Sequence, residues 1–151
     1  MTTVAYSHSE GVIAFDSRTS TGGLINSDDS MKMFESGDRK FFLSGMVPDM
    51  EYFVDNYENG SEYSRYLDVH GIMVDGVDVH IVGFNHNTLR FWGCKVDHDV
   101  AVGSGGDFAL SALKLGETVV DSVKLAATMD CYTGGKIRSY DVNTGKIKVH
   151  R

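Results

Sequence analysis

The first eighteen residues, Met1 to Arg18, read MTTVAYSHSEGVIAFDSR, and this stretch predicts how the fold begins. Two short runs of strand-forming residues, 4–7 and 12–15, lie on either side of Ser9-Glu10-Gly11. Those three residues have the composition of a tight turn. We therefore expect the two runs to pair as an antiparallel hairpin, with Asp16 directly after its second strand.

Thr2, at the start of this hairpin, is a candidate nucleophile. Removal of Met1 would leave Thr2 with a free α-amine, whose ordinary pKa of about 7.7 to 8.0 allows it to accept a proton near neutral pH. A hydroxyl nucleophile and its base would then belong to the same residue. Taken alone, Thr2 is better interpreted as an ordinary residue beside an initiator methionine, and only the surrounding pattern reverses that preference.

The composition is typical of a folded protein. A chain of 151 residues that is 42% hydrophobic and 11% aromatic suits one domain over residues 1–151. The net charge of -7 argues against nucleic acid or an anionic membrane surface as a partner. The sequence has neither an apolar run of about 20 residues nor a secretory signal, so we expect a cytoplasmic protein without a membrane span.

No cofactor or metal site is expected. Cys94 and Cys131 both lie in apolar or aromatic stretches, which predicts reduced, buried thiols rather than a disulfide or metal ligands. Asp97-His98-Asp99 could ligate a metal, but a solvated loop is the favoured interpretation. The glycine-rich segment 103–106 could bind phosphate, but it lacks the Lys-Ser/Thr that would follow in such a loop.

The apolar pattern predicts further strands along the chain. Residues 24–25 and 31–34 resemble a short pair, and residues 40–44 are expected to extend the first sheet. A second sheet is predicted from the strand-like runs 72–74, 77–84, 88–92 and 100–102. A closing hairpin is predicted from 137–142 and 147–150, joined by Asn143-Thr144-Gly145-Lys146.

Helices are predicted over residues 49–57, 108–115 and 119–131, with a weaker helical turn up to residue 67. Thr118 and Asp121 have the spacing of a capping box at the start of the last helix. On that helix Asp130 ends an otherwise apolar stripe, so its carboxylate needs polar partners. This order of elements favours an α+β fold of two stacked antiparallel sheets with helices outside.

Several segments together resemble the proteasome β-subunit and HslV family of threonine peptidases, which are N-terminal nucleophile hydrolases. The segments are Thr2-Thr3-Val4, Asp16-Ser17-Arg18 with Gly22, 27–34 with Lys32, Ser44-Gly45 with Asp49, and the glycine-rich pair 103–106 and 130–135. The resemblance implies a four-layer αββα sandwich. Because residues 45–71 are too few for two long helices, we expect the first helical layer to be shortened.

The resemblance also implies a role for individual residues. Thr2 matches the nucleophile, and its own amine, acting through a water, would be the general base. Lys32 would lower the pKa of the Thr2 hydroxyl, and Asp16 would hold that lysine charged and oriented. The Gly45 N–H would stabilise the oxyanion. An ordinary ion pair is the alternative for Lys32 and Asp16, and a simple turn is the alternative for Gly45.

Three further residues match those that hold the N-terminal amine by hydrogen bonds in the family: Ser104, Asp130 and Thr133. The implied function is a threonine-type peptidase that cleaves peptides or unfolded proteins within a self-assembled homo-oligomeric ring, with a partner ATPase unfoldase compatible with the resemblance. The alternative is a catalytically inactive, proteasome-like structural subunit of an assembly, and a retained Met1 would favour it. Hydrolysis of a non-peptide amide is a third interpretation.

Overall fold

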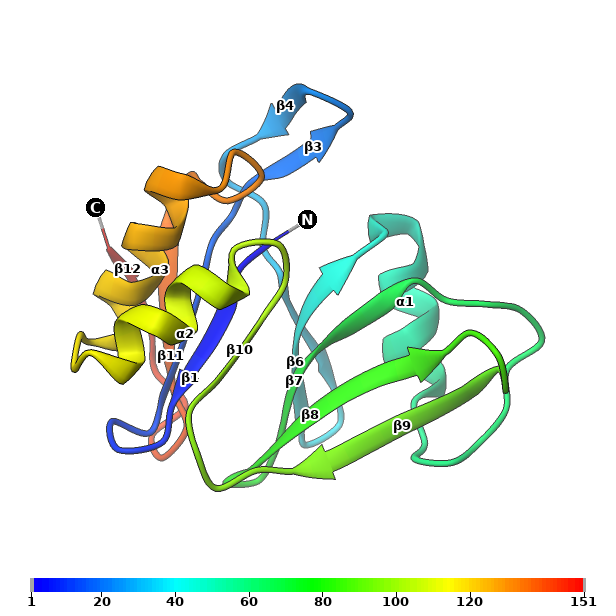
Figure 1. Cartoon of the computed structure of the whole chain (residues 1–151). Helices are drawn as coiled ribbons and strands as arrows, with labels where there is room; N and C mark the ends of the chain where they lie inside the picture. Colours follow the sequence, from blue (N-terminus) through cyan, green and yellow to red (C-terminus); the bar gives the residue numbers. More distant parts are fainter. Residues whose placement is uncertain (1, 151) are drawn as a thin grey trace.

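The computed structural model describes residues 2–150, which form two five-stranded antiparallel sheets, one separate hairpin and three helices (Figure 1). The first sheet has the order β10 (Val100–Val102), β1 (Val4–Ser7), β2 (Val12–Phe15), β11 (Ile137–Asp141), β12 (Ile147–His150). The second sheet has the order β5 (Met33–Ser36), β6 (Arg39–Gly45), β7 (Val69–Asp75), β8 (Asp78–Asn85), β9 (Arg90–Lys95). The expected removal of Met1 concerns a residue outside the described range.

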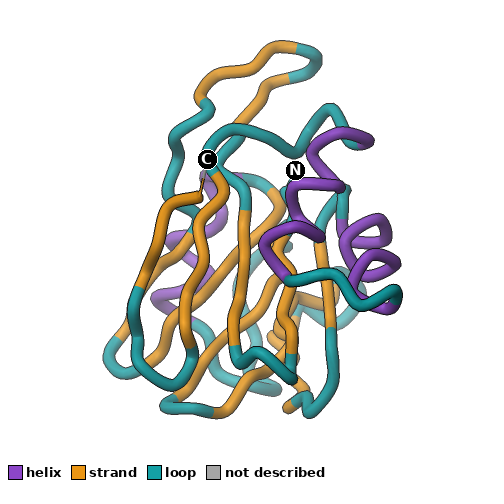
Figure 2. Tube along the Cα trace, turned by 90° about the vertical axis from the view of Figure 1, so that its left-hand side faces the viewer, coloured by secondary structure: helices purple, strands orange, loops and turns teal. Residues whose placement is uncertain are grey.

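The remaining elements are the hairpin of β3 (Thr19–Thr21) and β4 (Leu24–Ser27) and the helices α1 (Val47–Asn56), α2 (Gly106–Lys114) and α3 (Val119–Met129). The β3–β4 hairpin projects from the rest of the molecule as an arm (Figures 1 and 2). Within residues 2–150, none of the helices has the length and apolarity needed to cross a membrane.

The two sheets share an apolar core. Phe15 of the first sheet and Phe42 of the second are fully buried, and their ring centroids lie 5.3 Å apart. Phe42 also packs on Tyr140 of β11, at a centroid separation of 5.2 Å. Because side chains alternate along a strand, Phe41 and Leu43 point to the opposite face of β6, where they form a second cluster with Phe53 of α1.

Helices α2 and α3 cover the outer face of the first sheet, as Figure 1 shows. Ala5 and Ala14 lie on that face of the sheet and pack against Val123 and Ala126 of α3. Small side chains on the strands allow the helices to approach closely. The Thr118 hydroxyl caps α3 by accepting from the Asp121 N–H at 3.2 Å, as the capping box predicts.

The α+β class with two antiparallel sheets is confirmed, as are the first and last hairpins. Three pairings predicted from the sequence are wrong. Residues 24–25 pair with β3, whereas 31–34 fall largely in β5, which pairs with β6. Strand β6 belongs to the second sheet rather than the first, and β10 pairs with β1 in the first sheet rather than in the second.

Two further expectations are corrected. The segment 61–67 forms no helical turn, and Glu62 within it makes an isolated bridge to Arg90. Cys94 and Cys131 are free thiols, but both are exposed rather than buried. Cys94 lies on β9, an edge strand of the second sheet, and Cys131 lies in the loop after α3. An apolar stretch of sequence therefore did not guarantee burial at either position.

Candidate active site

The first hairpin places Thr2 beside Asp16. Val4 pairs with Phe15, and the Asp16 N–H continues the ladder by donating to the Thr3 carbonyl at 3.2 Å. In this register Asp16 Oδ1 accepts the Thr2 hydroxyl at 2.8 Å and the Thr3 N–H at 3.1 Å. The carboxylate thus fixes both the side chain of Thr2 and the backbone that follows it.

Lys32 completes this group from the segment that leads back from the arm. Its Nζ donates to Asp16 Oδ1 at 2.8 Å and also contacts the Thr2 hydroxyl. Thr2, Asp16 and Lys32 are 1%, 0% and 4% exposed, so all three residues are buried. Burial lowers the pKa of Lys32, and the neighbouring Asp16 carboxylate partly opposes this effect.

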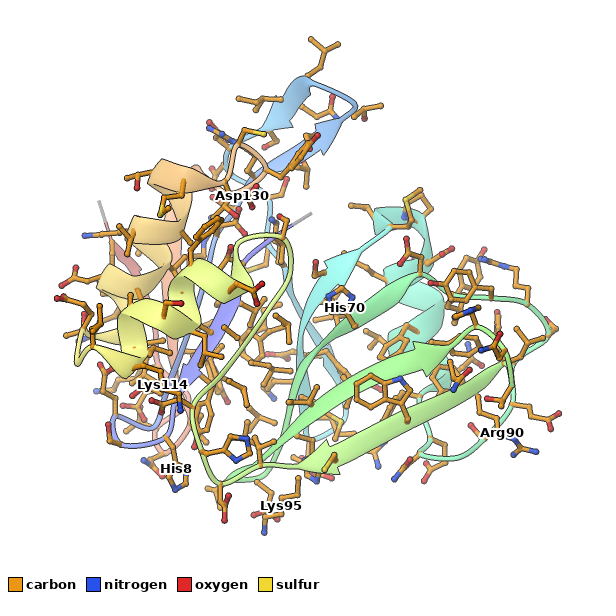
Figure 3. All side chains as sticks on the ribbon, in the orientation of Figure 1. His8, His70, Arg90, Lys95, Lys114 and Asp130 are labelled. Carbon is orange, nitrogen blue, oxygen red and sulfur yellow. The ribbon has the colours of Figure 1, made fainter. Side chains whose placement is uncertain are left out.

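A second hydrogen-bonded group centres on Asp130, which Figure 3 labels at the loop after α3. Its Oδ2 accepts the hydroxyls of Ser104 and Thr133, each at 2.6 Å, and its Oδ1 accepts the Tyr132 N–H at 3.1 Å. Partial burial would raise the pKa of Asp130, but these hydrogen bonds together lower it. Asp130 therefore has the polar partners that its position after the apolar stripe requires.

Thr3 connects the two groups. Its hydroxyl lies 2.7 Å from that of Thr133, which already uses its single hydrogen on Asp130. The Thr3 hydroxyl is therefore the donor in this pair. On the other side, Asp16 Oδ2 accepts the Gly134 N–H at 3.0 Å, so the segment 133–134 touches both groups.

Gly45 and Gly103 mark places where the backbone comes close to a neighbour. Gly45 ends β6 with a φ of 125°, and a Cβ there would overlap the Asp68 carbonyl. Gly103 has a φ of 93°, and a Cβ there would overlap the Thr2 carbonyl and approach the Ser44 hydroxyl. Ser44, the residue before Gly45, therefore lies close to the Thr2 backbone. The use of the Gly45 N–H as an oxyanion donor stays a prediction.

The structure therefore brings together Thr2, Asp16 and Lys32 directly, and joins Ser104, Asp130 and Thr133 to them through Thr3. Sequence reasoning missed the part played by the Thr3 hydroxyl and by the Gly134 N–H. Both residues lie in segments that carry the resemblance. The sequence therefore shows where they occur but not which residues they contact. Chemically, a hydroxyl held between a carboxylate and a buried lysine of lowered pKa is suited to lose its proton and attack a carbonyl.

No family model and no curated protein sequence matches the chain. Solved structures do match. Eukaryotic HslV from Trypanosoma brucei is 14% identical, with a TM-score of 0.72 over 98% of this chain and 99% of its own. BPH from Thiobacillus denitrificans in complex with epoxomicin is 18% identical, with a TM-score of 0.65 over 92% of this chain and 96% of its own.

The same Thiobacillus protein in a second structure is 19% identical, with a TM-score of 0.64 over 92% of this chain and 95% of its own. At identities this low, the structural match supports a conclusion about the fold alone. Because the matches cover at least 92% of this chain, that conclusion applies to nearly all of it. The chain has the fold of HslV, which confirms, at the level of fold, its resemblance to the proteasome β-subunit and HslV family.

Proposed function

We propose that this protein is a threonine-type peptidase whose nucleophile is Thr2, exposed by removal of Met1. The observation that supports it best is the placement of Lys32 Nζ against both the Thr2 hydroxyl and Asp16, within a buried site. An ordinary surface ion pair would not include a third group that can act as a nucleophile. The fold shared with HslV, at high coverage, adds support.

The proposed reaction is acyl transfer followed by hydrolysis. The Thr2 oxygen attacks the peptide carbonyl while its proton passes, through a water, to the α-amine of Thr2. The carbon–nitrogen bond then breaks, the leaving amine takes that proton, and an ester to Thr2 remains. Water hydrolyses the ester and restores the hydroxyl. The Gly45 N–H would stabilise the oxyanion in both steps.

The other residues hold this arrangement in place. Asp16 orients Lys32 and compensates its charge, and the buried lysine favours ionisation of the Thr2 hydroxyl. Ser104, Asp130 and Thr133 would hold the N-terminal amine, because their network already reaches Thr3, the residue that follows it. The reaction as proposed uses no metal and no cofactor.

We further infer that residues 1–151 form one domain with a four-layer αββα sandwich, shortened where α1 is the single helix between β6 and β7. Peptides or unfolded proteins would be the substrates, and a cytoplasmic homo-oligomeric ring would enclose the sites. An ATPase unfoldase is the partner that such a ring would need for folded substrates. Light scattering should give a mass several times that of the 16.6 kDa chain. A monomer at micromolar concentration would contradict the ring.

The intact mass of the purified protein, before and after epoxomicin, tests the peptidase proposal. We expect the chain to lack one methionine and to gain one inhibitor adduct. Thr2→Ser should keep the adduct because it keeps the hydroxyl, whereas Thr2→Ala should lose it. A full-length mass without an adduct would contradict the proposal and favour an inactive structural subunit.

A further inference from the structure

Arg138 is a buried arginine, 8% exposed, that the proposed reaction does not use. It lies on β11, where it pairs with Phe15, the residue before Asp16. Tyr140, two residues later, packs in the core between the sheets, so the Arg138 side chain points to the same inner face. A buried cation is costly, and an apolar side chain of similar size would stabilise the fold equally well. The burial of Arg138 therefore favours a role other than stability.

The Arg138 guanidinium binds two consecutive residues of the segment 28–32, which leads from the β3–β4 arm to Lys32. Its Nη2 donates to Asp29 Oδ1 at 2.5 Å, and its Nη1 donates to the Ser30 carbonyl at 3.2 Å. A guanidinium holds its donors in one rigid plane. The two bonds therefore fix the direction of the segment as well as its place.

The segment 28–32 crosses from the first sheet to the second. On the side of the first sheet, the Ser30 N–H donates to the Ser17 carbonyl at 2.9 Å, next to the bond from the guanidinium. On the side of the second sheet, the Lys32 carbonyl accepts the Leu43 N–H at 3.2 Å. The position of Lys32 thus depends on how both ends of the segment are held.

Lys32 follows Ser30 by only two residues. Two residues span at most about 7 Å, so a fixed Ser30 carbonyl restricts where the Lys32 backbone can lie. We propose that Arg138 is a positioning residue, which sets the place of the Lys32 amine relative to the Thr2 hydroxyl. This inference rests on the proposed peptidase function and deepens it, because Arg138 would act on the reaction through Lys32.

The test is the rate of epoxomicin adduct formation, measured by time-resolved intact mass in single and double variants. Arg138→Met should lower the rate about tenfold and leave the final amount of adduct unchanged, because a displaced lysine slows the reaction without removing the site. Arg138→Lys should recover part of the loss, since it keeps a cation beside Asp29. In the Lys32→Ala background, Arg138→Met should lower the rate by less than about twofold, because the residue through which it acts is absent.

Arg90→Met is the matched control. Arg90 also binds a carboxylate, that of Glu62 at 2.6 Å, and a backbone carbonyl, that of Gly60 at 2.7 Å. Figure 3 labels Arg90 on the opposite side of the molecule from Asp130. We expect this variant to keep the wild-type rate within about twofold. Thermal unfolding shows which variants fold, and Arg138→Lys carries the same comparisons if Arg138→Met does not fold.

The surroundings of Lys32 can also be measured without any reaction. In protein labelled with carbon-13 at the lysine Cε atoms, the Lys32 NMR signal is the one that Lys32→Ala lacks. Burial lowers the pKa of Lys32. In Arg138→Met this pKa should move back toward its ordinary value of 10.5, because the amine becomes less buried. Arg90→Met should leave it unchanged.

Two results would overturn the inference. One is a Lys32 signal and titration that Arg138→Met leaves unchanged, and the other is an equal loss of rate from Arg138→Met with and without Lys32. A wild type that forms no adduct would instead contradict the peptidase proposal. The NMR titration would still decide whether Arg138 positions Lys32, so the two failures can be told apart.

Discussion

At the scale of single residues, Asp16 holds the candidate site together. One of its oxygens accepts from Thr2, Thr3 and Lys32, and the other accepts from Gly134. A fully buried carboxylate is tolerated only when it has such partners, because its desolvation is costly. The ion pair between Asp16 and Lys32 is therefore weak evidence that the site stabilises the fold. Its geometry favours a role in orienting Thr2.

Lys32→Ala should reduce formation of the epoxomicin adduct at Thr2 by at least about 100-fold, because the charge that favours ionisation of the hydroxyl is lost. Most of the fold should persist, since Asp16 retains its bonds from Thr3 and Gly134. Time-resolved intact mass would measure the rate, with Lys114→Ala as the control variant. A wild-type rate in Lys32→Ala would refute the assigned role of the lysine.

Asp130 predicts a pH dependence of stability. Its folded pKa lies below the ordinary value of 3.8, so ionised Asp130 stabilises the folded state above the unfolded pKa, and this stabilisation is lost as pH falls through the folded pKa. Asp130→Asn should therefore be less stable than the wild type at pH 6, and the difference should shrink as pH falls below about 4. Urea unfolding at each pH measures it.

Asp55→Asn on α1 is the control variant. It removes one exposed carboxylate and therefore measures how a change of net charge alone affects the free energy of unfolding. If the difference in unfolding free energy between the wild type and Asp130→Asn stayed constant with pH, ionised Asp130 would not supply the proposed pH-dependent stabilisation.

At the scale of elements, the sequence predicted the first and last hairpins, whose turns are local. The turns at 8–11 and 142–146 lie between strands that are neighbours in both sequence and space. The sequence pattern missed two other local hairpins, β3–β4 and β5–β6, because it paired residues 24–25 with 31–34 instead. It also failed where partners are distant in the chain. Val100–Val102 pairs with β1, more than 90 residues earlier in the chain, and nothing in the local pattern of three apolar residues identifies that partner.

The same limit applies to the site. The residue types at Thr2, Asp16 and Lys32 could be assigned by resemblance, because the motif around each is local. The bond from Thr3 to Thr133 spans 130 residues and depends on the packing of α3 against the first hairpin. Such a contact follows from the arrangement of elements, which composition and periodicity do not encode.

Gly103, between β10 and α2, should tolerate no side chain. Its φ of 93° disfavours any L residue, and a Cβ would also overlap the Thr2 carbonyl. Gly76 has a φ of 65° but open space around a Cβ, so Gly76→Ala should cost only the conformational term of about 1 to 2 kcal/mol.

We expect Gly103→Ala to lose at least about 1 kcal/mol more of unfolding free energy than Gly76→Ala, measured by urea unfolding. It should also slow adduct formation, because the displaced backbone is that of Thr2. Equal losses in the two variants would show that the first strand can move away from Gly103 at no cost.

At the scale of the whole molecule, the two sheets share one apolar core, in which Phe42 of the second sheet packs on Phe15 and Tyr140 of the first. The site lies where the first strand of one sheet, the segment before β5 and the loop after β10 meet. Neither sheet could therefore hold Thr2 and Lys32 in place without the other. This arrangement predicts that the two sheets unfold together.

Phe42→Ala tests that prediction, because Phe42 is fully buried and packs on Phe15 and Tyr140 across the core. The variant should lose about 3 to 5 kcal/mol of unfolding free energy, whereas Leu115→Ala, at a side chain 87% exposed, should change it by less than about 0.5 kcal/mol. Fluorescence of Trp92 reports on the second sheet and circular dichroism on all elements. The two transitions should coincide in both variants, since one core links the sheets. Separate transitions, or a loss below about 1 kcal/mol for Phe42→Ala, would mean that each sheet is stabilised mainly by its own helices.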